Sequence, residues 1–394
     1  MTDCRQDGGF FFAIYVRMFP DGYQAENYCH PKNVNCHQAD SIKKKGSVFL
    51  MKNPRELVLE TLEFSDPDRI TRQIWLLPWA QNHYPQQAAY LLERYSDDIV
   101  HAPGYCKTPL KTQGDMYAIG TYVDEWGCEF INRQEGIIGE VKRPLIENWS
   151  DLVNIRVPKE RLTINPDEIN AFCNSTDKFV LSSTGVRPFE QIQFLRGTEN
   201  VMIDLAAREE HLLNLIDTCH SFYSEELELW AKTDVDGLFF MDDWGTQQSL
   251  LISPDQWRQI FKPLYKDYVD IAHRYGKKIF MHSDGYILDI FPDLIEIGLD
   301  AINSQLFCME MDKLRAFAGK ITFWGEIDRQ YLLCQGTPEQ VRAAVFEVYK
   351  NLYCNGGVIG QVDFGVGAKP ENVEAALAAW EEISRSELDD HYKI

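Results

Sequence analysis

The stretch SPDQWRQIFKPLYKDYVDIAHRYGKKIFMHSDG, residues 253–285, contains the repeating unit from which the fold can be predicted. Ser253 and the proline after it suit the start of an amphipathic helix. The apolar run that follows, residues 277–284, has the length of a buried strand and ends in His282 and Asp284. Such an ending is either the polar exit of a core strand or a metal or acid–base site at the mouth of a barrel.

The same helix-and-strand unit recurs along the chain. Further strands are expected at residues 97–103, 178–184, 236–243, 299–305, 320–326 and 357–364. Strands that alternate with helices pair in parallel, and these runs are apolar throughout, as strands covered on both faces are. No G-x-G-x-x-G follows any of them, which speaks against a doubly wound dinucleotide-binding sheet. We therefore predict a (β/α)8 TIM-type barrel with a β-hairpin insertion at residues 120–146, turning at Asn-Arg-Gln-Glu-Gly (132–136).

The first fifty residues differ from the rest because they show no sustained helical or strand periodicity. A well-defined helix starts just after Met51, with Asn53 as its cap and Pro54 at its first position. We expect residues 1–50 to be a disordered or non-native extension and residues 51–390 to form a single barrel domain.

Composition narrows the class of protein. The formal net charge of −21 repels phosphate backbones, so a nucleic-acid partner is not expected. No run of eighteen apolar residues suggests a membrane span, and the early GGFFFAIYV lacks the preceding basic cluster of a secretory signal. We expect a cytoplasmic enzyme, with a homo-oligomer left open.

The ten cysteines do not form any C-x-x-C pair, and their scatter favours reduced thiols that mostly pack in the core. Two adjacent Cys–His pairs, Cys29–His30 and Cys36–His37, could imitate a zinc cluster. They lack the usual two-to-four-residue ligand spacing, so no metal is predicted there.

The carboxyl ends of the predicted strands are where a barrel places its active site. These ends carry polar residues in pairs: Thr184 and Arg187, Asp242 and Asp243, His282 and Asp284, Asn303 and Gln305, Glu326 and Asp328, Gln361 and Asp363. A packed core has no use for several carboxylates that converge on one axis, because buried charges must be paired or bound to metal. The pattern therefore predicts a functional site.

Roles can be assigned from spacing and chemistry. His282 and Asp284 lie two apart and so share one strand face, where we expect them to hold a divalent metal, most simply zinc, with Glu326 or Asp363 completing the shell. The candidate catalytic residues are Asp242, Asp243, His282 and Glu326, of which the two aspartates would orient substrate or act as general base. The candidate substrate-binding residues are Arg187, Trp244, Tyr286, Gln305 and Asp328.

Each candidate also has a purely structural interpretation. Asp242 or Asp243 could cap a neighbouring segment, and His282 could bond only to a nearby acid. Glu326 could pair with Arg329. Asp363 could cap the last helix, and Trp244 and Trp324 could belong to the core.

Several segments together resemble the uroporphyrinogen decarboxylase superfamily. They are NPRELVLETLEFSDPDRI, DEWGCEF, ISPDQWRQIFKPLYK, IFMHSDG, DLIEIGLDAINSQ, ITFWGEIDRQYLL, GTPEQVRAAV and KPENVEAAL. The resemblance covers about residues 51–385. It implies the barrel fold and an activity from one of two branches, decarboxylases of tetrapyrroles or methyltransferases that serve corrinoid proteins.

The resemblance implies that the decarboxylase branch acts without metal or cofactor. Its members bind the propionates of the substrate with an arginine-rich loop early in the chain. In this chain the corresponding segment, residues 72–84, contains only Arg72, whereas a substrate with many carboxylates needs several arginines.

The methyltransferase branch holds zinc with a His-x-Cys pair and a further cysteine near the last strand. Here His282 matches, Asp284 replaces the first cysteine, and GQVDFG near Val362 has none. Carboxylates are harder ligands than thiolates, which suits an oxygen-bearing methyl donor better than a thiol. The resemblance thus implies a metal-dependent methyltransferase that moves a methyl group between a small methoxy compound and a corrinoid carried by a partner protein. The alternatives are a cofactor-free decarboxylase and a non-catalytic binding protein on the same barrel.

Overall fold

Eight parallel strands form the central sheet of the protein, in a computed structural model that describes residues 52–391 and the side chains of residues 52–384. Their order is β1-β11-β10-β9-β8-β7-β6-β2. The strands are β1 (Thr71–Leu76), β2 (Ile99–His101), β6 (Phe179–Leu181), β7 (Gly237–Met241), β8 (Lys278–Ser283), β9 (Ala301–Ser304), β10 (Thr322–Trp324) and β11 (Val358–Phe364).

The two end strands of this order, β1 and β2, meet at a seam made largely by side chains. The Asp98 amide donates to the Arg72 carbonyl at 2.9 Å, and the Asp97 carboxylate accepts from the Ile74 amide at 2.7 Å. The sheet is therefore a nearly closed barrel, and the predicted (β/α)8 fold is confirmed.

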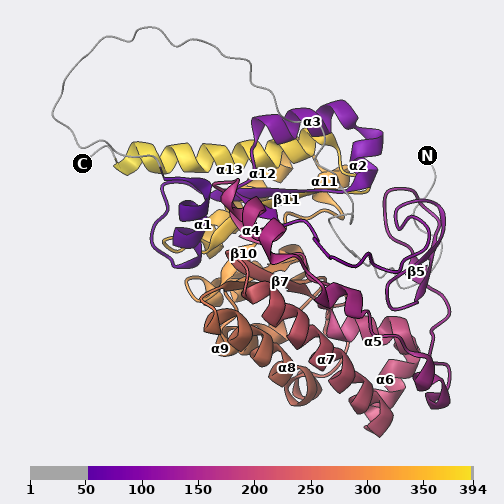
Figure 1. The fold of residues 1–394 in the computed structure, drawn as a ribbon. Helices are drawn as coiled ribbons and strands as arrows, with labels where there is room; N and C mark the ends of the chain where they lie inside the picture. Colours follow the sequence, from indigo (N-terminus) through magenta and orange to yellow (C-terminus); the bar gives the residue numbers. More distant parts are fainter. Residues whose placement is uncertain (1–51, 392–394) are drawn as a thin grey trace.

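Helices surround the barrel, and Figure 1 shows the long C-terminal α13 lying across its outside beside α3. The α-helices are α1 (Pro54–Leu62), α2 (Pro78–His83), α3 (Pro85–Arg94), α4 (Pro166–Asn174), α5 (Pro188–Arg196), α6 (Thr198–Ala207), α7 (Glu210–Ala231), α8 (Pro254–Arg274), α9 (Phe291–Ile297), α10 (Met311–Leu314), α11 (Leu332–Gln335), α12 (Pro338–Leu352) and α13 (Pro370–His391). Short 3-10 helices are η1 (Trp149–Asn154), η2 (Lys159–Leu162), η3 (Leu288–Ile290), η4 (Leu306–Cys308) and η5 (Arg315–Phe317).

The predicted helix starts are confirmed by their caps. The side chains of Asn53, Ser253 and Thr337 accept from the amide three residues on, at 2.9, 3.2 and 3.3 Å respectively. The proposal for residues 1–50 lies outside the described residues.

The structure adds detail to two segments in the first half of the chain. Residues 72–84, the segment matched to the early loop of the decarboxylase branch, form most of strand β1 and helix α2. The insertion is a three-stranded antiparallel sheet of β3 (Gly120–Val123), β4 (Glu129–Asn132) and β5 (Glu140–Val141), so it has two turns. The first turn, Asp-Glu-Trp-Gly-Cys at residues 124–128, was missed; the predicted turn at 132–136 lies in the second.

Aromatic side chains fill the barrel interior below its carboxyl end. Trp324 packs edge-on against Trp75 and Phe280, with ring centroids 5.1 Å apart in both cases. Side chains two positions apart on a strand point the same way. His282 lies two positions beyond Phe280 on β8, and Gln361 lies two positions beyond Ile359 on β11, so both point inward, and both are buried. The polar layer therefore lies directly above a layer of packed aromatic side chains.

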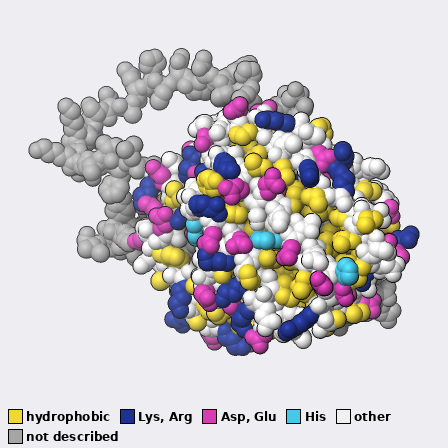
Figure 2. All heavy atoms as spheres, turned by 60° about the horizontal axis from the view of Figure 1, so that its bottom comes forward, with side chains coloured by type: hydrophobic (Ala, Val, Ile, Leu, Met, Phe, Trp, Pro, Cys, Tyr) yellow, Lys and Arg dark blue, Asp and Glu magenta, His cyan; other side chains and the backbone are white. Residues whose placement is uncertain are grey.

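On the face drawn in Figure 2, acidic and basic side chains are interspersed rather than gathered into patches of one sign. Within the described chain, none of the helices is both long and apolar enough to cross a bilayer. Of the seven described cysteines, all free, only Cys128, Cys173 and Cys219 are buried, so the expected core packing of most thiols was too broad.

Candidate metal centre at the barrel mouth

Strands β7 and β8 present the central residues of the site and are locked together beyond their last ladder bonds. The Asp284 amide donates to the Asp243 carboxylate at 2.8 Å, and the Gly245 amide donates to the Asp284 carbonyl at 3.0 Å. Gly285 has a φ of 77°, and a Cβ there would lie 2.2 Å from the Gly245 carbonyl oxygen. Glycine is therefore required for the close approach that brings the two aspartates together.

His282 is oriented by an amide on the neighbouring strand. Its Nδ1 lies 2.6 Å from the Asn303 Oδ1, and the Asn303 amide nitrogen donates in turn to the Trp324 carbonyl. This chain fixes Nδ1 as the protonated nitrogen, because only an N–H can donate to that oxygen. In the neutral ring the other nitrogen, Nε2, is then unprotonated and carries the free lone pair.

Nε2 faces two carboxylates. It lies 3.4 Å from the Asp284 Oδ1 and 3.6 Å from the Asp243 Oδ1, and it has no hydrogen-bond partner although His282 is only 1% exposed. Burial, the largest cause, lowers the pKa of His282, so the imidazole is not held as a cation. A neutral lone pair that faces two acids in a buried site leaves room for a cation between them.

The donor set fits zinc. Asp243, His282 and Asp284 each offer a ligand atom, and these atoms all lie within 4.8 Å of one another. Two ligands of a tetrahedral zinc, each about 2.1 Å from the ion, lie about 3.4 Å apart, close to the two separations measured from Nε2. The nitrogen-and-oxygen set and the orphaned Nε2 thus match a three-ligand site with an open position.

The predicted third ligands Glu326 and Asp363 are not in this cluster. Both instead face the guanidinium of Arg329, at 3.1 Å from Glu326 and 4.0 Å from Asp363. Arg329 also lies 2.5 Å from Asp284. The third member of the metal cluster is Asp243, and the alternative pairing of Glu326 with Arg329 is what the structure contains.

Burial dominates the titration of these acids. It raises the pKa of Asp243 and of Glu326 well above the usual range, and it raises that of Asp363 to about 7. The charge of Asp284 acts in the same direction on all three. The single guanidinium of Arg329 is therefore not enough to keep all the acids of this cluster ionised.

Asp242 and Trp244 lie on the other side of β7, in the packing against α5. The Asp242 carboxylate accepts from the Phe189 and Glu190 amides at 2.9 and 2.8 Å and from the Tyr265 hydroxyl. The Trp244 ring is fully buried and stacks on Phe189 at 3.9 Å. The structure therefore gives both residues a place in the scaffold, as the alternative interpretations had it.

Gln305 and Asp328 line a pocket beside the cluster with an empty volume of about 410 Å³, part of it open to solvent, together with Gln247, Leu306, Phe307, Cys308, Glu326, Arg329, Gln330 and Tyr331. Gln305 also accepts from the Gly285 amide at 3.0 Å, and Asp328 accepts from the amides of Gln330 and Tyr331. Tyr286 is half-buried and does not line this pocket.

Glu190 is the acid that sequence reasoning missed. It is buried in the first turn of α5, and its Oε1 has no partner. Burial, opposed by Arg187 and reinforced by Asp242 and Asp284, raises its pKa to about 8. Its position two residues after Pro188, in the first turn of a helix that follows a barrel strand, was the available signal.

The fold and the site define a (β/α)8 barrel with a candidate divalent-metal centre at the carboxyl ends of its strands. The chain belongs to the uroporphyrinogen decarboxylase (URO-D) family, whose model matches residues 117–383, more than half of its length. No curated protein matches the sequence.

A solved methyltransferase structure supports the same fold. A methyltransferase from Methanosarcina mazei is similar with a TM-score of 0.58 at 16% identity, covering 84% of this chain and 99% of its own. A 3-keto-D-glucoside 4-epimerase from E. coli, also 16% identical, gives a TM-score of only 0.35 over 58% of this chain and 86% of its own.

Proposed function

We propose that the protein is a metal-dependent methyltransferase that moves a methyl group between a small methoxy compound and a corrinoid carried by a partner protein. The observation that carries the proposal is the orphaned Nε2 of His282 between the carboxylates of Asp243 and Asp284. Family membership and the fold shared with a methyltransferase support it.

Asp243, His282 and Asp284 would hold zinc, which supplies a Lewis acid for an ether oxygen when bound. Asn303 keeps the imidazole in the tautomer that can ligate. Arg329 balances the charge of Asp284 from the outer side. The packed aromatic layer of Trp75 and Trp324 lies directly below these residues.

A methoxy oxygen that loses its methyl group keeps the electron pair of the broken bond and needs a proton. Glu190, with its raised pKa, carries a proton on its carboxyl group at neutral pH and is close enough to Asp284 to feel its charge. We assign Glu190 the role of proton donor in this proposal.

Elemental analysis followed by a methyl-transfer assay tests the proposal. The full chain, purified without chelator from zinc-supplemented medium, should contain about one zinc per chain, as a single three-ligand site requires. It should methylate a reduced corrinoid from at least one compound in a methoxy panel, and Asp243→Asn should lose both properties. Absence of stoichiometric metal would reject the metal-dependent mechanism.

The second candidate function is cofactor-free decarboxylation, favoured by the buried acids Glu326 and Asp363 next to a guanidinium. Arg72, the arginine of the early segment, lies in β1 and its Nε donates to the Ser96 carbonyl at 3.2 Å, so it is already engaged. We therefore expect no appreciable turnover of uroporphyrinogen. Coproporphyrinogen formed by the pure protein would favour the decarboxylase instead.

A further inference from the structure

Arg187 is a buried cation without a counter-ion in contact. It immediately precedes α5 and is only 5% exposed. Its Nη1 has no hydrogen-bond partner, and among residues 52–384 its guanidinium forms no ion pair, although its charge acts at longer range on Asp124, Glu190 and Asp242. Buried guanidinium groups are normally paired, because desolvating an unpaired charge is costly. Such a group is a candidate for pairing with a ligand.

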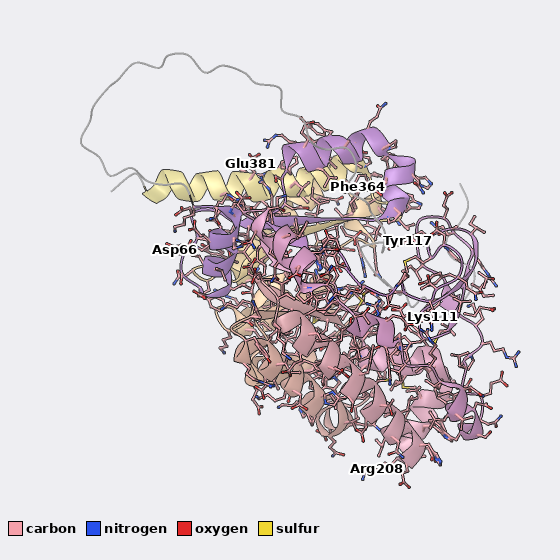
Figure 3. All side chains as sticks on the ribbon, in the orientation of Figure 1. Asp66, Lys111, Tyr117, Arg208, Phe364 and Glu381 are labelled. Carbon is pink, nitrogen blue, oxygen red and sulfur yellow. The ribbon has the colours of Figure 1, made fainter. Side chains whose placement is uncertain are left out.

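The pocket that Arg187 lines is otherwise mostly apolar. It lies between the inserted sheet and α5 and has an empty volume of about 380 Å³, most of which is open to solvent; the enclosed part is small, with room for roughly one or two water molecules. Figure 3 labels Lys111 and Tyr117 on the segment that leads into this sheet. The apolar lining residues are Met116, Tyr122, Phe130, Ile138 and Phe194. One polar end and an apolar body are the usual composition of a small-molecule site.

The two acids that line the same pocket are already satisfied. Asp124 accepts from the backbone amides of Trp126 and Cys128 at 3.0 and 2.7 Å. Glu125 is paired with Arg161 at 2.6 Å. Neither is therefore available to neutralise the guanidinium of Arg187 at contact distance.

This pocket is tied directly to the candidate metal centre. Asp242 holds the start of α5 through the amides of Phe189 and Glu190, and the next residue, Asp243, belongs to the metal cluster. A ligand bound to Arg187 would thus lie next to the proposed zinc site.

We propose that Arg187 binds the carboxylate of a small aromatic or short-chain acid whose apolar body packs against Phe130 and Phe194. The inference rests on the proposed function for the statement that this acid is the methyl donor, whereas the binding of the carboxylate stands on the pocket alone. A planar guanidinium pairs with a carboxylate through two parallel hydrogen bonds, which the free Nη1 can join.

Isothermal titration of benzoate into the full chain tests the pocket without requiring metal or corrinoid. Benzamide, which has the same ring but no charge, is the ligand control. Arg187→Gln removes the charge, and Arg187→Lys keeps the charge but not the planar fork. Arg342→Gln, on the exposed face of α12, is the matched variant that removes one positive charge far from the pocket.

Wild type and Arg342→Gln should bind benzoate alike, roughly tenfold or more tightly than Arg187→Gln does, with Arg187→Lys in between. Benzamide should bind weakly to all four proteins. Without ligand, the melting temperature of Arg187→Gln should equal or exceed that of wild type, because an unpaired buried charge has been removed. Equal benzoate affinity in wild type and Arg187→Gln, or a lowered melting temperature of Arg187→Gln, would overturn the proposal.

The two proposals can fail separately. Benzoate binding that depends on Arg187, in a protein without metal or methyl transfer, would support the carboxylate pocket and reject the proposed function. Methyl transfer by a protein that does not bind benzoate would reject the pocket alone.

Discussion

Two buried arginines at the same end of the barrel differ in what surrounds them. Arg329, 7% exposed, faces three carboxylates, those of Asp284, Glu326 and Asp363. Arg187, 5% exposed, has no carboxylate in contact distance among the described residues. Both are desolvated, yet only Arg329 is in ion-pair contact with acids, whereas the charge of Arg187 acts on Asp124, Glu190 and Asp242 only at longer range.

The difference separates a charge that holds the site together from a charge that is available to a ligand. The guanidinium of Arg329 stabilises acids that would otherwise be buried without a partner, so it belongs to the folded state. Arg187 makes no such contact, and its desolvation is fully offset when a ligand supplies an anion at contact distance. Substitutions should therefore affect stability in the first case and binding in the second.

Arg329→Met should produce the largest effect. It removes the cation that Asp284, Glu326 and Asp363 share, and the loss in free energy of unfolding should be about 3–5 kcal/mol, the usual cost of breaking a buried ion pair from one side. Urea denaturation at pH 7 measures it. Arg187→Met is the paired control and should cost little; a similar loss in both variants would erase the distinction between the two arginines.

His282→Gln should have the next largest effect, on metal affinity rather than on folding. The imidazole was expected at the rim, but the structure buries it against the Trp75 ring at a centroid distance of 5.4 Å, so a glutamine of comparable size is a better substitute than alanine. The zinc dissociation constant should rise on the order of 100-fold or more, measured by competition with a chromophoric chelator. His273→Gln, on the surface beside Asp300, should bind zinc as wild type does.

The barrel could be predicted from the sequence because helices and strands alternate with clear caps, as at Ser253 and Thr337. Strand β1 was missed because polar Arg72 and Gln73 interrupt its apolar pattern, and because it closes the barrel through contacts with distant segments. Register and closure depend on tertiary pairing that no local window contains.

The candidate site could be predicted only in part. His282 and Asp284 were recognised together because two residues on one strand face are a local relation. The choice of Asp243 over Glu326 as their companion depends on where Arg329 lies, three residues beyond Glu326 in the loop that follows β10. Sequence spacing allowed that ion pair but could not rank it against a metal.

Asp363→Asn should change the pH dependence of stability. The pKa of Asp363 is about 7 when folded and about 3.9 when unfolded, so between these values the native state holds more protons. The contribution of Asp363 to the free energy of unfolding is fully present below about pH 4 and is lost as the pH rises toward 7. Between pH 5 and pH 8, the free energy of unfolding of wild type should therefore fall by about 1–2 kcal/mol more than that of Asp363→Asn, after allowance for coupling to Glu326.

Urea titrations at the two pH values supply the measurement for Asp363→Asn. Asp312→Asn, an exposed change on α10, serves as the control and should follow wild type. If wild type and Asp363→Asn respond identically to pH, Arg329 keeps Asp363 ionised, and the acids around that arginine are better compensated than we infer.

Removal of residues 1–50 should have the smallest effect. Helix α1 closes its own N-terminus, since Asn53 and Glu56 cap each other's amides at 2.9 Å and Lys52 pairs with Glu60 at 2.7 Å. A chain that starts at Met51 should keep its melting temperature within about 2 °C, because surface changes away from such contacts stay within roughly 0.5 kcal/mol. It should also retain the contrast between the arginines, with Arg329→Met destabilising and Arg187→Gln weakening only benzoate binding. A truncated chain that fails to fold, or that loses benzoate binding while still folded, would show that residues 1–50 contribute to the barrel or to the Arg187 pocket.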